Sequence, residues 1–167
     1  MIKKNKRFVF VVDNFLPIEI LQYLQNQAVQ QDYSASATKD NDHYGFGVKV
    51  ENSMLENDMI LKKIYEDFNV PKEVKLSNAF MHMRYNSKVL PHIDKGHYSF
   101  LLYLKGEPLL NNGTGFLNPN SEIAVHAGFL ENRAIFFNAG LTKHTDMQGF
   151  GESSPRYSLN IFFKYEK

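Results

Sequence analysis

Five polar residues in the second half of the chain have types and spacings that could form one reactive centre. They are His92, Asp94, His144, Arg156 and Ser158. The first three can supply two imidazoles and one carboxylate to a single metal ion, a ligand set typical of mononuclear iron sites with open coordination positions. The guanidinium and the hydroxyl could bind an anionic co-ligand. These residues predict metal-dependent redox chemistry.

The spacing of these residues suggests how they could converge. His92 and Asp94 are two apart, so in an extended segment both side chains project from one face and Ile93 from the other. Arg156 and Ser158 repeat that spacing. The third ligand must return from a distant part of the chain, and His144 has room for several strands before it.

Each of these residues also has an ordinary structural interpretation. His92 could be a surface or core histidine, Arg156 could form a surface salt bridge, and Ser158 could simply alternate on a strand. His-x-Asp occurs twice, but the second copy, His144-Thr145-Asp146, has no later His. His126 is an alternative third ligand, because it lies near another predicted strand. The metal-site prediction therefore rests on the ordered set and its strand-rich surroundings.

The elements that must position these residues change character along the chain. A first strand is expected over residues 7–12, a helix after Pro17, a surface loop over residues 35–47, and a second helix from the capping box at Ser53–Glu56 towards Pro71. Short strands are expected afterwards, at residues 76–85, 97–104, 123–126, 133–137 and 156–165. Helices followed by many short strands predict a single α+β domain, mainly β, over residues 1–167.

Composition excludes several classes. The hydrophobic fraction of 43% is that of a globular protein, and a net charge of +1 provides no field for nucleic acid. The absence of Cys excludes disulfides and thiolate ligands. The apolar stretches are too short for a signal peptide or a membrane span, so we expect a soluble, cytoplasmic protein.

From Asp13 onward the chain resembles the 2-oxoglutarate- and Fe(II)-dependent dioxygenase superfamily, particularly its small prolyl-hydroxylase-like members. The similar segments are Asp13-Asn14-Phe15-Leu16-Pro17, Pro91-His92-Ile93-Asp94, residues 99–104, Gly113-Thr114-Gly115-Phe116, residues 132–137, His144 and residues 155–163.

The resemblance implies a double-stranded β-helix, or jelly roll, with N-terminal helices packed on one sheet and Fe(II) held by His92, Asp94 and His144. 2-Oxoglutarate would chelate the iron, and Arg156 would pair with its distal carboxylate. Ser158, Tyr85 and Tyr103 are further candidates for co-substrate contacts, with core packing as the alternative for the two tyrosines. The implied cofactors are Fe(II), 2-oxoglutarate and O2, with ascorbate as an optional reductant.

The implied activity is hydroxylation of a peptide or small molecule, with release of succinate and CO2. Two alternatives stay open: a cupin-like metalloenzyme that uses no keto acid, and a non-catalytic binding module on the same barrel. Prolyl hydroxylases often carry Lys where this chain has Arg156, so the pattern names no substrate. The sequence also leaves the oligomeric state open.

Overall fold

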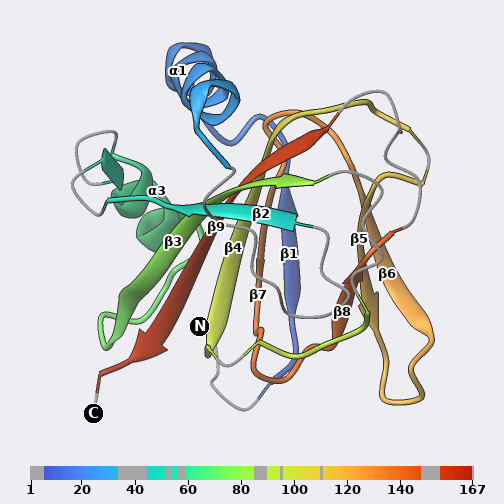
Figure 1. Cartoon of the computed structure of the whole chain (residues 1–167). Helices are drawn as coiled ribbons and strands as arrows, with labels where there is room; N and C mark the ends of the chain where they lie inside the picture. The colour runs from blue at the N-terminus through green and yellow to red at the C-terminus, as the bar shows by residue number, and fades with distance from the viewer. Residues whose placement is uncertain are drawn as a thin grey trace.

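The elements that the structure describes in full are two antiparallel sheets and two helices, α1 and α3 (Figure 1). The computed structural model describes residues 6–33, 45–51, 54–55, 59–84, 90–94, 96–109, 111–147 and 155–166. The elements are β1 (Val9–Val12), α1 (Ile18–Gln30), β2 (Gly45–Lys49), α3 (Ile60–Asp67), β3 (Val74–Arg84), β4 (Tyr98–Lys105), β5 (Gly113–Leu117), β6 (Ile123–Gly128), β7 (Ala134–Phe137), β8 (His144–Asp146) and β9 (Arg156–Tyr165).

The larger sheet has the strand order β1-β7-β4-β9-β3-β2, and the smaller sheet has the order β6-β5-β8. Neighbouring strands in both sheets are antiparallel. The prediction of a mainly β domain is therefore confirmed, and the arrangement is consistent with a jelly roll.

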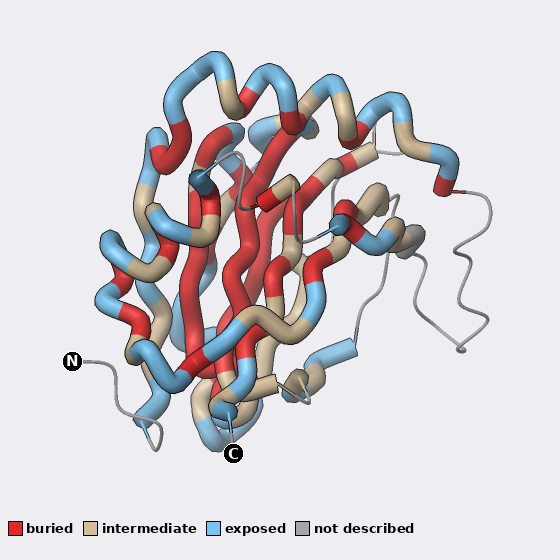
Figure 2. Tube along the Cα trace, turned by 90° about the vertical axis from the view of Figure 1, so that its left-hand side faces the viewer, coloured by how far each residue is buried: buried red, intermediate tan, exposed pale blue. Residues whose placement is uncertain are grey.

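Side-chain alternation gives the larger sheet two different faces. On β4, Phe100 and Leu102 belong to an apolar cluster that also contains the buried residues of α1 and α3, whereas Leu101 and Tyr103 belong to a second cluster with residues of the smaller sheet. A strand buried on both faces has a continuous apolar run, as residues 100–104 do. Figure 2 shows these central strands buried along most of their length.

Helix α1 contributes Leu21, Leu24 and Ala28 to the first cluster. These positions recur at helical spacing and so lie on one face of the helix. Ile18 and Val29, two further apolar residues of this helix, are exposed. Val29 follows the buried Ala28 by one residue. A step of one residue in a helix rotates the side chain by about 100°, which turns Val29 away from the buried face.

Expected and observed elements agree closely for the later strands, and two expectations are corrected. Gly45–Lys49 is a strand that pairs with β3, although residues 45–47 were expected to belong to a loop. The second helix is not continuous, because Met59 adopts a left-handed conformation (φ 57°) directly before α3. A helix cannot continue through that conformation. Ser53 and Glu56 of the expected capping box, and residues 35–44 of the loop, lie outside the described residues.

Strands β5 and β8 were not expected as separate elements, since each is short. They matter because β8 begins at His144 and pairs with β5. Within the described part of the chain, neither helix has the length and apolar character needed to cross a membrane.

Candidate metal centre and anion pocket

The structure brings His92, Asp94 and His144 together. One potential ligand atom from each residue lies within 4.8 Å of the other two. His92 Nε2 is 3.5 Å from Asp94 Oδ1, and His144 Nε2 is 3.7 Å from Asp94 Oδ2. Two atoms bound to one ion at about 2.1 Å lie roughly 3–4 Å apart, so these separations fit ligands of a shared metal.

The backbone fixes the two histidines beside each other. His92 and His144 form an isolated antiparallel bridge, in which each N–H donates to the other residue's carbonyl oxygen at 2.9 Å. Because β8 is also paired with β5, the segment that carries His92 is tied to the smaller sheet. The third ligand thus reaches the first two through strand pairing.

The outer ring nitrogens of both histidines face backbone carbonyls. His92 Nδ1 lies 2.9 Å from Leu90 O, and His144 Nδ1 lies 3.2 Å from Thr142 O. A carbonyl accepts a hydrogen bond, so Nδ1 of each ring carries a proton, and Nε2 of each ring faces Asp94. This is the usual way in which a second contact orients a metal-binding imidazole.

Ser99 holds the carboxylate of the centre. Its Oγ donates to Asp94 Oδ2 at 2.9 Å from strand β4. Burial alone would raise the pKa of Asp94, but hydrogen bonds from His92 and Ser99 and the charges of the two imidazoles lower it. The hydrogen bond to Asp94 raises the pKa of His92, whereas burial lowers the pKa of His144. An ionised carboxylate and a neutral imidazole are the forms that bind a metal.

Ser99→Ala should therefore weaken metal binding without removing a ligand. We expect a roughly tenfold loss of Mn(II) affinity, at the lower end of the effect of removing an outer hydrogen bond from a metal ligand. Mn(II) titration followed by electron paramagnetic resonance measures this loss. Ser77→Ala is the control, because Ser77 lies on β3 away from the centre. An equal affinity in the Ser99 and Ser77 variants would contradict an orienting role for Ser99.

A cavity of about 80 Å³ opens beside the three candidate ligands. One water needs roughly 10–15 Å³ by this measure, so the cavity has room for a small acid. Its lining includes His82, Arg84, Asp146, Arg156, Ser158 and Asn160 as well as the candidate ligands. The metal-binding atoms and a set of charged and hydrogen-bonding groups therefore share one space.

Strand alternation points Arg156 and Ser158 into this cavity, whereas Tyr157 packs against the cluster on the other face. Arg156 is only 2% exposed. Its Nη1 donates to Gly113 O at 3.0 Å and to Asn112 Oδ1 at 3.3 Å. Ser158 Oγ donates to Asn160 Oδ1 at 2.9 Å. The predicted shared face of Arg156 and Ser158 is confirmed.

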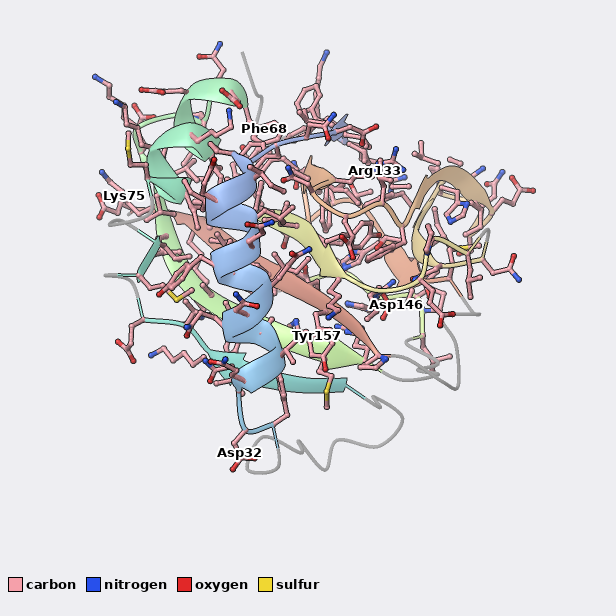
Figure 3. All side chains as sticks on the ribbon, turned by 90° about the horizontal axis from the view of Figure 1, so that it is seen from above. Asp32, Phe68, Lys75, Arg133, Asp146 and Tyr157 are labelled. Atoms are coloured by element: carbon pink, nitrogen blue, oxygen red, sulfur yellow. The ribbon has the colours of Figure 1, made fainter. Side chains whose placement is uncertain are left out.

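Asp146 pairs with the cavity arginines. Its Oδ1 accepts from Arg156 Nη2 at 2.5 Å, and its Oδ2 accepts from Arg84 Nη1. Burial would raise the pKa of Asp146, but the charges of Arg156 and Arg84 outweigh it and keep the carboxylate ionised. The second His-x-Asp of the sequence thus supplies one metal-ligand candidate, His144, and one counter-ion. Figure 3 shows Asp146 on the opposite side of the molecule from α3 and Phe68.

A neutral histidine also lines the cavity. Burial, with a smaller effect from the charge of Arg84, lowers the pKa of His82 to about 3. Its Nδ1 is buried and has no hydrogen-bond partner among the described residues. A buried polar atom of this kind is normally satisfied, so it is available to a bound molecule.

The remaining sequence candidates lie elsewhere. Tyr103 is buried beneath Arg156, with the guanidinium 5.5 Å from its ring centroid, and its hydroxyl hydrogen-bonds Thr114 Oγ1 at 2.8 Å. His126 is exposed on β6 and is not part of the metal cluster. Tyr85 lies outside the described residues. Its role and that of Tyr103 in co-substrate binding stay predictions.

Sequence reasoning missed four residues of the site: Ser99, Arg84, Asp146 and His82. Alternation offered a signal for two of them. Asp146 is two residues after His144 on one strand, and Arg84 is two residues after His82. The sequence indicated that the two residues of each pair lie on one face of their strand. It did not indicate that β3 pairs with β9 or that β8 pairs with β5.

The fold has many solved relatives, although no protein-family model matches the chain and no curated protein matches it significantly. The viral collagen prolyl hydroxylase of Paramecium bursaria Chlorella virus-1, solved with 2-oxoglutarate, aligns with a TM-score of 0.71 at 16% identity, over 97% of this chain and 98% of that one. HygX from Streptomyces hygroscopicus, solved with nickel and 2-oxoglutarate, aligns with a TM-score of 0.70 at 8% identity, over 94% and 82%.

A third similar structure is the non-haem α-ketoglutarate-dependent epimerase SnoN from nogalamycin biosynthesis. It aligns with a TM-score of 0.67 at 13% identity, over 94% of this chain and 78% of that one. The chain therefore has the fold of prolyl hydroxylases and other 2-oxoglutarate- and Fe(II)-dependent oxygenases, as its sequence motifs predicted. The viral protein is a prolyl hydroxylase and SnoN is an epimerase, so the fold does not determine the outcome of the reaction.

Proposed function

We propose that the protein is a 2-oxoglutarate- and Fe(II)-dependent oxygenase that hydroxylates a peptide or small molecule and releases succinate and CO2. One observation carries this proposal. The His92, Asp94 and His144 cluster opens onto the same cavity as two arginines. A keto diacid has a chelating end and an anionic end, and this cavity offers a partner for each.

The residues of the centre fit Fe(II). Two imidazole nitrogens and one carboxylate converge on one point, as in the facial triad of non-haem iron oxygenases. The bound iron would supply the activation of O2 by electrons from the keto acid. His92, Asp94 and His144 would hold the metal, and Ser99 would keep the carboxylate turned towards it.

The walls of the cavity suit a dry reaction site. Phe137, Phe162 and Leu101 line it beside the polar groups. Apolar walls exclude water and strengthen the electrostatic interactions inside. Ser158, Asn160 and His82 would orient the keto acid by hydrogen bonds, while the arginines would neutralise its distal carboxylate.

The size of the cavity favours a substrate that stays outside it. About 80 Å³ accommodates a small acid but not a peptide as well, so the oxidised group would approach from the mouth. Among the similar structures, SnoN is an epimerase and not a prolyl hydroxylase. We therefore propose no prolyl substrate over another peptide or small molecule.

Turnover of 2-oxoglutarate tests the proposed function. Purified protein with Fe(II), 2-oxoglutarate and O2, with and without ascorbate, should form succinate and CO2 even without a substrate, at a slow uncoupled rate. Succinate is measured by mass spectrometry. The control is the same protein with a chelator. If the metal-loaded protein neither binds 2-oxoglutarate nor forms succinate with any candidate substrate, the proposal is wrong.

One observation favours a second candidate, a metalloenzyme that uses no keto acid. Arg156 already pairs with Asp146, so the predicted partner of the distal carboxylate is neutralised within the protein. Under this alternative, Arg156→Ala would leave metal-dependent activity intact. Under the leading proposal, Arg156→Ala weakens 2-oxoglutarate binding.

A further inference from the structure

Strand β1 forms one edge of the larger sheet, and its outer side is open. It pairs with β7 on one side, and no strand of the described part of the chain lies on the other. Its sequence is Val-Phe-Val-Val, without the charge, proline or bulge by which natural sheets prevent an edge from pairing with another chain. Phe10 and Val11 are 45% and 43% exposed, on opposite faces of the strand. The edge is therefore apolar and unprotected.

The pairing with β7 shows which backbone groups of β1 point outward. Asn138 N–H donates to Phe8 O at 3.3 Å, so Phe8 and every second residue after it exchange hydrogen bonds with β7. The residues between them, Val9 and Val11, direct their N–H and C=O groups away from β7. None of the described residues bonds to these groups. They can form the bonded positions of a further antiparallel strand.

The other sheet edges in the described part of the chain are less suited to pairing. The outer side of β8 is bonded to His92. On β6, Arg133 Nη1 donates to Gly128 O at 2.7 Å and so occupies an outward carbonyl. Strand β2 contains two glycines and ends at Lys49, a sequence that weakens strand pairing.

We propose that β1 pairs with β1 of a second copy of this chain, in antiparallel orientation about a two-fold axis at Phe10. In this register Val9 and Val11 of the second copy are each other's bonded partners across the edge, and Phe10 faces Phe10 in a non-bonded pair. The same strand serves both copies, as a closed two-fold interface requires. The two larger sheets become one continuous sheet. This inference does not depend on the proposed function.

Charges at the two ends of β1 favour a second copy and fix this register. Arg7 precedes Phe10 by three residues, and Asp13 follows it by three. With Phe10 on the axis, Arg7 of each copy therefore lies opposite Asp13 of the other, and opposite charges across antiparallel strands stabilise the pair. A shift of two residues in either direction would remove both of these charge pairs.

Contacts with β7 hold both charged residues in line with the strand. Asn138 Nδ2 donates to Lys6 O at 2.9 Å, directly before Arg7. Asp13 pairs with Arg133 at 2.6 Å, and its side chain is still 44% exposed. A carboxylate has about four acceptor positions, so Asp13 can bind Arg7 of a second copy and keep Arg133.

Cysteine cross-linking tests both the dimer and its register, because the chain contains no Cys. Residues facing each other in a non-bonded pair have Cα atoms about 4.5 Å apart, within the range of a disulfide. Phe10→Cys, oxidised with diamide, should therefore form a covalent dimer. Val11→Cys is the matched control, because the two copies of Val11 are diagonal neighbours about 7–8 Å apart and should link much less. Equal linkage of the two variants, or none in Phe10→Cys, would overturn the inference.

Sedimentation equilibrium tests the dimer without a cross-link. The mass of the wild type should rise with concentration from 19.3 kDa towards twice that value. Val11→Lys puts a charge on the edge and should weaken the dimer at least about tenfold. Val125→Lys is the control, since it changes a valine of β6 with a similar exposure of 42% and should leave the dimer intact. A wild type that is monomeric even at about 1 mM, or a dimer that Val11→Lys does not weaken, would show that β1 is not the interface.

Discussion

His92→Ala should lower the affinity for Mn(II) or Fe(II) by about 100-fold or more and abolish succinate formation. Loss of an outer hydrogen bond to a metal ligand lowers metal affinity or activity roughly 10–100-fold, and loss of a ligand itself should lower them at least as much. His92 is the best site for this test because its side chain is 37% exposed, compared with 12% for His144. Its truncation removes a ligand without opening a hole in the core. Electron paramagnetic resonance of a Mn(II) titration measures the affinity.

The matched control for this prediction is His126→Ala. His126 is an exposed histidine of β6, and it was the alternative third ligand from sequence. Its replacement should change neither metal affinity nor succinate formation. Thermal unfolding of both metal-free variants should stay close to that of the wild type. Unchanged metal binding in His92→Ala, or lost binding in His126→Ala, would show that the ligand set is wrong.

Asp146→Asn should destabilise the metal-free protein by about 3–5 kcal/mol, the usual cost of breaking a buried ion pair by removing one partner. The loss leaves Arg84 and Arg156 opposite each other without their anion. For a chain of this size, the midpoint of thermal unfolding should fall on the order of 10 °C. Urea unfolding followed by circular dichroism measures the free energy.

Arg84→Gln should be the milder single change, because it leaves Arg156 and Asp146 as a one-to-one pair. Combining it with Asp146→Asn should recover part of the lost stability. The remaining guanidinium still donates to Gly113 O and Asn112 Oδ1. Side chains in one ion-pair network couple by roughly 0.5–3 kcal/mol, so strictly additive changes in the free energy of unfolding would show that Arg84 and Arg156 do not repel each other.

Local sequence was sufficient for much of the architecture. The last strand, Arg156–Tyr165, has the predicted bounds, and the helix after Pro17 begins at Ile18. Both have a strong repeating pattern over ten or more residues. The shorter β8 and the left-handed Met59 were not predicted, because three residues carry too little periodicity and a single backbone reversal carries none.

The candidate ligands could be predicted because their signal is local and ordered. His92 and Asp94 share a face by alternation, and the same rule places Arg156 and Ser158 on one face. The motifs around them supplied His144 by resemblance. The bridge between His92 and His144 gives the physical reason for that choice over His126.

The sequence by itself determined which residue types are available for a metal and an anion, and which neighbours on a strand face the same way. Only the tertiary structure decided the electrostatics of the pocket. Three contacts depend on strand register and on the packing of the two sheets. Arg84 lies opposite Arg156, Asp146 binds both of them, and Ser99 donates to Asp94. These are long-range properties, and a shift of one residue in register would turn each of these side chains to the other face.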